Sequence, residues 1–473
     1  MRDIHHALVL NMHQPPNNLE HLLDTNEWEA KEILFAYDRM PRVLWEYQDI
    51  ARVHLSLSGT LLESLSNPSF QERTYGMVDC GKLLWHLQNE RLFEILGTGY
   101  YHPVLALIPE ADWDEHIARW QSIARHVFWR NQFNGFWPPE MGFDMRIIPH
   151  LKRAGYRYVM VDCEYVDPVD SMSWQELRYR PHIAEYGGEQ IVIIVRDRDL
   201  SDAQLSGMDY GWFYHELHER TKWCDFPPLV TTATDGDNGG WFRNVTDQSN
   251  FWTYFYRQAM EEIRAGHSSL RPTFITEYLD RFGAHGQVTV RRGAWNTDTH
   301  HGWDFHQWQG SWAQRDTMVR VHDLSREFHV VAQAAARVGD PNPELARVMN
   351  EAHWHLLRAE TSCNFYWGEA WVHKSHADLD SVAWHLGEAK AILGDRLIAP
   401  PTAPAKTGEA DATETEPTAT SNVAPTEPDP PPTAPATPET ATDETPTTAR
   451  AESDPSLTAP AAPVVAVVVP PKT

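Results

Sequence analysis

Two acidic residues, Glu140 and Asp235, follow apolar runs of the kind that forms buried strands. Facing carboxyl groups are what cleavage of a glycosidic bond requires, because one attacks the anomeric carbon while the other donates and then removes a proton. Gly236 beside Asp235 would let the backbone turn sharply and expose the carboxylate. A single acid at a strand end more often caps a helix or joins an ion pair, and Asp235 with Asp237 could also bind a small cation. The pair therefore indicates acid–base chemistry only if the fold brings the two carboxyl groups together.

Histidines accompany two other strand ends, at His13 and His102. Each could hold a sugar hydroxyl, bind zinc or satisfy loop backbone, and zinc would need three convergent ligands. Further nitrogen comes from His300, His301, His353 and His355. Residue counting therefore leaves metal and sugar roles open.

Aromatic residues are concentrated away from the carboxyl terminus, since all 20 Trp fall within the first 400 residues. Trp295, Trp303 and Trp308 alternate with acidic residues and histidine, which is typical of sugar subsites where flat rings stack on a pyranose face. The segment 358–367 ends a predicted helix and runs into aromatic residues that include Trp367. It either packs in a core or lowers polar groups and a Trp onto the mouth of a pocket.

Alternating strands and helices must position these groups. Seven apolar or β-branched runs are predicted as strands, at 6–13, 51–58, 94–102, 133–140, 156–162, 190–197 and 228–235. Helical patterns between several of them favour a parallel sheet, and the number of strands favours a closed or nearly closed β/α barrel. In such barrels the reactive side chains project from the carboxyl ends of the strands. The polar residues described above fall at those ends.

The carboxyl-terminal third changes character. Three helical runs without intervening strands occupy 315–394 and are expected to cap the barrel. Residues 401–473 hold 16 of the 33 Pro and no Trp, Phe, Tyr or His, so this segment cannot bury enough apolar surface to order itself. The predicted domains are a catalytic barrel at 1–312, a helical region that completes the cleft at 313–396 and a disordered tail at 397–473.

Composition excludes several functions. The formal charge is −26, of which −8 falls on residues 401–473 and −18 on the rest, and no basic block is present, so a nucleic-acid partner is not expected. No apolar run approaches the roughly 20 residues that span a bilayer. The four Cys lack CxxC spacing and the amino terminus lacks a basic region before its apolar stretch, so we expect a cytoplasmic protein.

Five segments, in order, resemble the characteristic regions of glycoside hydrolase family 57. They are His13-Gln14-Pro15, GTGYYHPVLALIP at 97–109, WPPEMGFD around Glu140, DGDNGGWF from Asp235, and the helix end from Ala359 to Trp367. One departure is Asp237, where the family often has Glu. The order and spread of the five segments over 13–367 make the resemblance specific.

The resemblance implies an incomplete (β/α)7 barrel followed by a helical region, with Glu140 as nucleophile and Asp235 as proton donor. It implies retaining cleavage of α-glucosidic bonds without a cofactor or catalytic metal. The substrate-binding residues expected on this basis are His13, Gln14, His102, Trp137, Asp237, Trp241, Trp303, Glu360 and Trp367.

Several functions stay open at this point. We expect a hydrolase of α-glucans such as starch, glycogen or maltooligosaccharides, and the alternative is an α-glucan transferase, either a 4-α-glucanotransferase or a branching enzyme. A metal-dependent mannosidase or deacetylase would need a His-x-Asp or Asp-Asp pair on the first strand, whereas His13 is followed by Gln14 and Pro15. A catalytically impaired carbohydrate-binding homologue is the third alternative. Bond type, chain length and oligomeric state are not encoded in these motifs.

Overall fold

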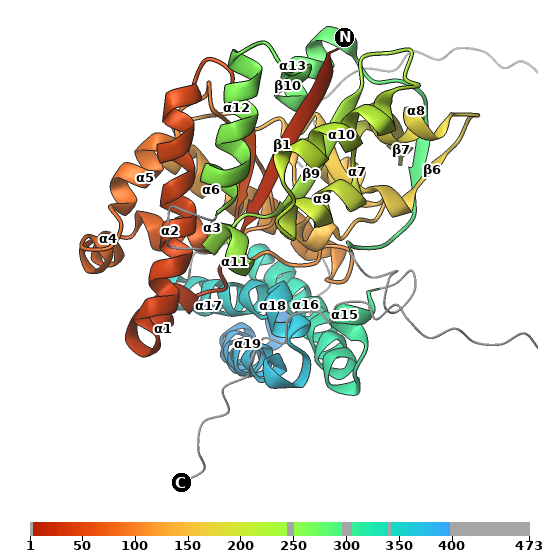
Figure 1. Cartoon of the computed structure of the whole chain (residues 1–473). Coiled ribbons are helices and arrows are strands. Elements are labelled where there is room, and N and C mark those ends of the chain that lie inside the picture. The colour runs from red at the N-terminus through yellow and green to blue at the C-terminus, as the bar shows by residue number, and fades with distance from the viewer. Residues whose placement is uncertain (1–2, 244–249, 296–304, 339–341, 398–473) are drawn as a thin grey trace, which may run out of the picture. The chain divides into compact units, whose positions relative to one another are not determined.

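The computed structural model describes residues 3–243, 250–295, 305–338 and 342–397 (Figure 1). The predicted tail, 397–473, lies outside the described residues except for its first position. The domain boundaries proposed from the sequence stay a prediction.

Seven parallel strands form the barrel, and their order around it is their order along the chain. They are β1 (Ile4–Met12), β2 (Val53–Leu57), β3 (Phe93–Leu96), β4 (Gly135–Phe136), β5 (Tyr158–Asp162), β8 (Glu189–Arg196) and β9 (Leu229–Asp235). Each corresponds to one of the seven predicted strands, so the expected β/α barrel is confirmed.

One long ladder and two sparsely paired seams close the barrel. β9 pairs with β1 from His5↔Leu229 to Asn11↔Asp235, whereas β3 and β4 meet only through a bridge between Gly97 and Phe136. β8 and β9 share a single pair, Arg196↔Thr231. The sparse pairing at these two seams fits the incomplete barrel that the sequence indicates.

Four short strands lie off the barrel path. β10 (Leu270–Pro272) pairs with the start of β1, β7 (His182–Tyr186) runs antiparallel to β8, and β6 (Val166–Pro168) pairs with β11 (Val288–Val290). None of these four strands was predicted from the sequence.

Alternation along the strands divides the apolar core in two. On β1, Leu8 and Leu10 belong to a cluster with the helices around the barrel, whereas Ala7 and Val9 point inward and join a second cluster. Successive strand residues face opposite sides, so the inward set also includes Asn11 and Asp235 at the carboxyl ends of β1 and β9. The strand register thus decides which polar side chains reach the barrel mouth.

Helices connect the barrel strands. In chain order they are α1 (Asn18–Thr25), α2 (Glu27–Leu44), α3 (Gly59–Ser66), α4 (Pro68–Thr74), α5 (Cys80–Leu87), α6 (Glu110–Phe128), α7 (Ile147–Arg153), α8 (Trp174–Tyr179), α9 (Arg198–Leu205), α10 (Tyr210–Thr221), α11 (Gly239–Arg243), α12 (Arg257–Arg264) and α13 (Ile275–Phe282). No helix among the described residues is both long and apolar enough to cross a membrane.

A helical region covers the carboxyl end of the barrel strands (Figure 1). It consists of α15 (His306–Gln309), α16 (Trp312–Arg337), α17 (Pro343–Ala359), α18 (Ser362–Tyr366) and α19 (Val372–Leu393). The three predicted helical runs correspond to α16, α17 and α19. A bridge between Pro103 and Thr361 and a 3.1 Å bond from the Ser362 amide to the His102 carbonyl attach it to the barrel mouth.

Candidate active site

Glu140 lies in a tight turn just after β4. Pro138 and Pro139 end the strand, and Glu140 and Met141 then adopt left-handed backbone conformations with φ of 57° and 51°. For a residue with a Cβ this conformation costs about 1–3 kcal/mol, and it persists only where surrounding contacts impose it. Such strain is concentrated at functional sites, and here it sets the direction of the Glu140 side chain.

Both carboxylate oxygens of Glu140 accept hydrogen bonds. The Ser362 hydroxyl donates to Oε1 at 2.9 Å and the Trp295 indole donates to Oε2 at 3.1 Å. The Trp295 amide also donates to the Glu140 carbonyl at 3.1 Å, which fixes the turn itself. Burial raises the pKa of Glu140, and the bonds from Ser362 and Trp295 oppose that rise by stabilising the ionised form.

Asp235 ends β9 with its side chain directed inward. Asn11, its partner in the β1 ladder, donates from Nδ2 to Oδ1 at 3.0 Å. Burial, followed by the negative charges of Asp237 and Glu140, raises the pKa of Asp235 to about 7. Because the charge of Glu140 contributes, the two carboxyl groups interact electrostatically, and a pKa of about 7 lets Asp235 keep its proton up to about neutral pH. This is the arrangement that a nucleophile and a proton donor require.

Gly236 serves a different purpose from the predicted sharp turn, because its φ lies outside the left-handed region. Its amide donates to the Asn11 carbonyl at 2.8 Å, and a Cβ at this position would lie 3.0 Å from the Cβ of Leu10. Glycine is therefore required because the end of β9 approaches β1 closely.

Asp237 and Gln14 contact each other beside Asp235. Tyr37 donates to Asp237 Oδ2 at 2.5 Å and Gln14 Nε2 donates to the same oxygen at 3.3 Å. The side-chain amide oxygen of Gln14, Oε1, in turn accepts a hydrogen bond from Asn18 Nδ2 at 2.8 Å. The structure thus surrounds both predicted substrate-binding residues with protein partners, and it shows Asp237 acting on the pKa of Asp235.

His13 and His102 stack on one another at the barrel mouth, with ring centroids 4.0 Å apart and planes at 11°. His102 Nδ1 lies 3.1 Å from the Ser362 hydroxyl and 3.6 Å from Glu140 Oε1. Burial lowers the pKa of His102 to about 3 and, with the charge of His102, lowers the pKa of His13 further below its usual value. Both rings are therefore neutral. Among the described residues, neither buried ring nitrogen of His13 has a hydrogen-bond partner.

Ser362, Cys363 and Tyr366 are site residues that sequence reasoning missed. They lie on α18, where Ser362 and Cys363 are adjacent and Tyr366 follows one turn after them. Burial and then the charges of Glu140 and Asp235 raise the pKa of Tyr366, and the same groups act on the Cys363 thiol. The segment 358–367 as a whole was expected either to pack in a core or to bring polar groups and a Trp to the pocket mouth, but these three residues were not individually predicted as site residues.

Glu360 is buried away from the two catalytic candidates. Its Oε2 lies 2.8 Å from His116 Nε2 on α6. Burial and the nearby charge of Asp112 raise the pKa of Glu360 well above its usual value, which favours its protonated form. Asp112 also accepts from Ser325 at 2.6 Å and contacts His329 at 2.7 Å. Glu360 therefore joins α17 to α6.

The predicted aromatic contacts are divided among several environments. Trp137 is fully buried edge-to-face against Trp295, with centroids 5.5 Å apart, and Trp241 is partly buried against Tyr254 at 6.1 Å. Trp367 is 51% exposed, so a sugar ring could stack on it. Trp303 lies outside the described residues.

A metal-ligand arrangement occurs elsewhere. Among the described residues, the group of His, Cys, Asp or Glu side chains with metal-binding spacing is Glu351, His355 and His385, on α17 and α19. None of these contributes to the environment of Glu140 or Asp235 described above.

Comparisons with known proteins agree with the fold. The model of glycosyl hydrolase family 57 matches residues 9–291. An α-amylase of Pyrococcus abyssi is 30% identical over 299 residues, which are 61% of this chain and 40% of that protein. The crystal structure of 4-α-glucanotransferase from Thermococcus litoralis has a TM-score of 0.61 at 20% identity, over 83% of this chain and 60% of that one. The crystal structure of a branching enzyme from Pyrococcus horikoshii has a TM-score of 0.62 at 15% identity, over 82% of this chain and 88% of that one. The chain thus spans well under half of the curated relative's length.

Proposed function

Because the chain belongs to glycosyl hydrolase family 57, we propose that it cleaves α-glucosidic bonds of α-glucans with retention of anomeric configuration. One observation supports this more than any other: burial and two nearby carboxylates bring the pKa of Asp235 to about 7, while Glu140 accepts two hydrogen bonds that favour its ionised form. A protonated acid and an ionised nucleophile at neutral pH are the starting state of double displacement.

In the first step Glu140 attacks the anomeric carbon while Asp235 transfers its proton to the leaving glycosidic oxygen. The C–O bond to the leaving sugar breaks as the bond to the Glu140 carboxylate forms, which gives a glycosyl ester and an ionised Asp235. The bonds from Ser362 and Trp295 hold both oxygens of Glu140 in place for this attack.

In the second step Asp235 accepts a proton from water, and the hydroxide equivalent attacks the anomeric carbon. The ester bond breaks, and Glu140 leaves as a carboxylate while Asp235 is protonated again. Two inversions at one carbon give net retention. Neutral His13 and His102 would hold hydroxyls of the sugar under attack, since neither ring carries a charge that would compete with the carboxylates.

A transferase uses the same carboxylates and differs only in the acceptor, which is a sugar hydroxyl in place of water. The observation that favours this second candidate is a group of aromatic side chains next to the site. Trp367 lies 5.0 Å from Tyr366 and 6.1 Å from Trp371, measured between ring centroids. Tyr366 and Trp367 are exposed and Trp371 is partly buried, so these neighbouring rings would give an acceptor chain a stacking surface.

The test combines an analysis of the reaction products with chemical rescue of variants at the two acids. The wild type is incubated with amylose, pullulan and maltooligosaccharides, and product lengths and anomeric form are followed by chromatography and NMR. Shorter α-anomeric products indicate hydrolysis, whereas longer or branched products indicate transfer. Initial β-anomeric products would overturn retention.

Azide rescue then assigns the two acids. With an activated aryl α-maltoside, Asp235→Ala in azide should give an α-glycosyl azide, because azide attacks the ester formed on Glu140. Glu140→Ala should give a β-glycosyl azide by direct attack. Full activity of either variant without azide contradicts the assignment.

The remaining alternatives have separate outcomes. Activity on mannosides or N-acetyl groups that is lost to a chelator and restored by a metal would favour the metal-dependent mannosidase or deacetylase. Glucan binding without turnover in the wild type would favour the impaired homologue.

We also propose that the protein is located in the cytoplasm. It is supported by Cys80, Cys163, Cys224 and Cys363, none of which is in a disulfide bond. Cell fractionation that recovers the protein outside the cytoplasm would contradict it.

A further inference from the structure

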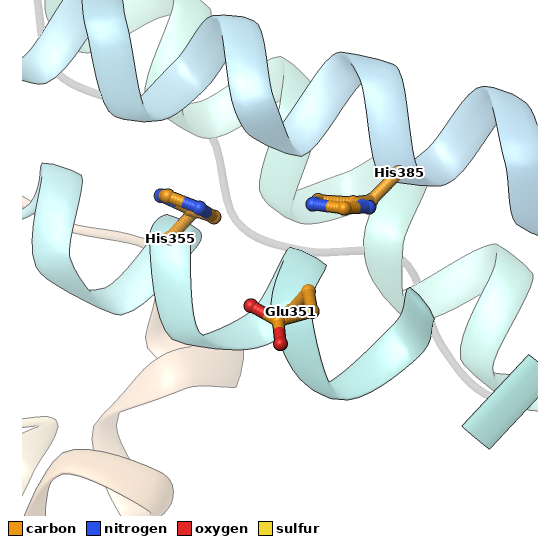
Figure 2. A group of neighbouring side chains, drawn as sticks. All are labelled: Glu351, His355 and His385. Carbon is orange, nitrogen blue, oxygen red and sulfur yellow. The ribbon is translucent and has the colours of Figure 1, made fainter. Parts of the chain in front are cut away.

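Three metal-capable side chains converge between two helices of the capping region. Glu351 and His355 lie one turn apart on α17, and His385 comes from α19 (Figure 2). One ligand atom from each side chain lies within 4.8 Å of the others. We call these three residues the α17–α19 cluster.

Each histidine of the cluster is oriented by its own carboxylate. His355 Nδ1 lies 2.8 Å from Asp378 Oδ1, and His385 Nδ1 lies 3.0 Å from Glu388 Oε2. The two rings are nearly parallel, at 21°, with centroids 6.0 Å apart. A carboxylate on Nδ1 fixes the tautomer and leaves Nε2 as the more basic ligand nitrogen, which is the usual outer shell of a metal-bound histidine.

We propose that the α17–α19 cluster binds one zinc ion. Two imidazoles and one carboxylate form a donor set that zinc accepts readily, whereas magnesium and calcium prefer oxygen ligands. Water would complete a tetrahedral shell, because Glu351 is exposed and the two histidines are only partly buried. At zinc distances of ~2.0–2.1 Å the ligand atoms would be ~3.3 Å apart, so atoms that now lie within 4.8 Å of one another must approach by at most ~1.5 Å. The exposed Glu351 side chain can supply much of that movement by rotation.

Zinc at this position would fasten α17 to α19. The connection between the two helices carries Ser362, which bonds Glu140. α19 already holds the end of α17 through Ser375, whose hydroxyl donates to the Ala359 carbonyl at 2.6 Å. The ion would therefore act on the stability of the capping region and is not a participant in bond cleavage. This inference does not depend on the proposed reaction.

The same histidines could instead serve as partners in ion pairs. Asp378 Oδ2 also lies 3.2 Å from Arg358 Nε. The charges of Glu388 and Glu351 contribute, after Glu344, to the raised pKa of the nearby Arg347. Ion pairs need protonated rings and strengthen as pH falls, whereas zinc needs neutral rings and binds more tightly as pH rises. The two roles therefore predict opposite pH dependence.

The test uses the full chain stripped of metal with a chelator. Zinc titration followed by calorimetry should give one site per chain at pH 7.5, and zinc should raise Tm at pH 7.5 and lose most of this effect at pH 5.5. Cobalt substituted for zinc should give the intense visible absorption of a tetrahedral ion. Absence of stoichiometric binding by the stripped wild type overturns the proposal.

Variants locate the ion. His385→Gln and His355→Gln should each weaken zinc binding at least ~100-fold, and Asp378→Asn by about 10- to 100-fold through the outer shell. Glu351→Gln tests the same cluster at an exposed position, should folding fail in the histidine variants. His373 is an exposed histidine on α19, the helix that carries His385. His373→Gln is therefore the matched control and should bind zinc as the wild type does. Equal zinc affinity in Glu351→Gln, His385→Gln and the control would also overturn the assignment.

Discussion

The hydroxyl of Ser362 donates a 2.9 Å hydrogen bond to Oε1 of Glu140, although the two residues are 222 positions apart. The same hydroxyl lies 3.1 Å from His102 Nδ1, so one small side chain joins a strand end, a second barrel loop and the helical region. The capping helices therefore complete the surroundings of Glu140 as well as covering them.

Ser362→Ala should lower kcat by about 10- to 100-fold, because a hydrogen bond to a charged group contributes roughly 1.5–3 kcal/mol. Loss of the bond also removes one of the two contacts that oppose the raised pKa of Glu140. The acidic limb of the kcat/KM profile should therefore move to higher pH. Ser381→Ala, at an exposed position of α19, is the control. An acidic limb that stays in place would contradict the role of Ser362.

The alkaline limb of kcat/KM should follow Asp235, whose pKa is about 7. Above this pH the proton donor is ionised, and the rate falls tenfold for each further pH unit. Asp237→Asn removes a negative charge that raises the pKa of Asp235, so this limb should move to lower pH. Rate profiles between pH 4 and 9 measure both effects. A limb that moves to higher pH in Asp237→Asn contradicts the electrostatic explanation.

Asp235→Asn should stabilise the fold, and more so at pH 8 than at pH 5. The folded pKa of Asp235, about 7, lies above the ordinary value of about 3.9. Between these values the folded chain keeps a proton that the unfolded chain has released, so Asp235 makes the free energy of unfolding fall as pH rises through this window. Asparagine carries no charge and can still accept from Asn11. Thermal unfolding at both pH values checks this, and a smaller gain at pH 8 than at pH 5 is the contrary result.

The barrel could be read from the sequence because its signals are local. Each of the seven barrel strands is an apolar run, and each of α16, α17 and α19 is a periodic stretch long enough to stand out. β4, with only two residues, was found because Trp137 and the following prolines marked its end. The off-path strands β6, β7, β10 and β11 were not predicted, because their pairing depends on where the barrel has already placed their partners.

The site was predictable only where strand ends carry it. The order of the motifs singles out Glu140 and Asp235, and the fold places them where their charges interact. The environment of each acid comes from long-range packing that local patterns do not encode. Trp295 and Ser362 donate hydrogen bonds to Glu140 from positions 155 and 222 residues away in the sequence. Tyr37 donates to Asp237 across a separation of 200 residues. For the same reason Glu360 was assigned to the substrate from its motif, whereas its side chain points to α6.

Glu360→Gln should leave kcat and KM for maltooligosaccharides within about twofold of the wild type. Burial and the charge of Asp112 raise the pKa of Glu360 well above its usual value, which favours the uncharged acid, and glutamine preserves its size and its ability to contact His116. A residue that binds substrate as a carboxylate would lose activity on the same change.

Glu360→Leu supplies the matched contrast. It leaves His116 and Asp112 facing an apolar side chain, and burying polar groups that have lost a partner costs about 1–3 kcal/mol each. Tm should therefore fall in Glu360→Leu and hold in Glu360→Gln, while the pH profile of kcat/KM stays unchanged in both. A Glu360→Gln variant with wild-type Tm and strongly raised KM would return Glu360 to the substrate pocket, because only a lost sugar contact gives that combination.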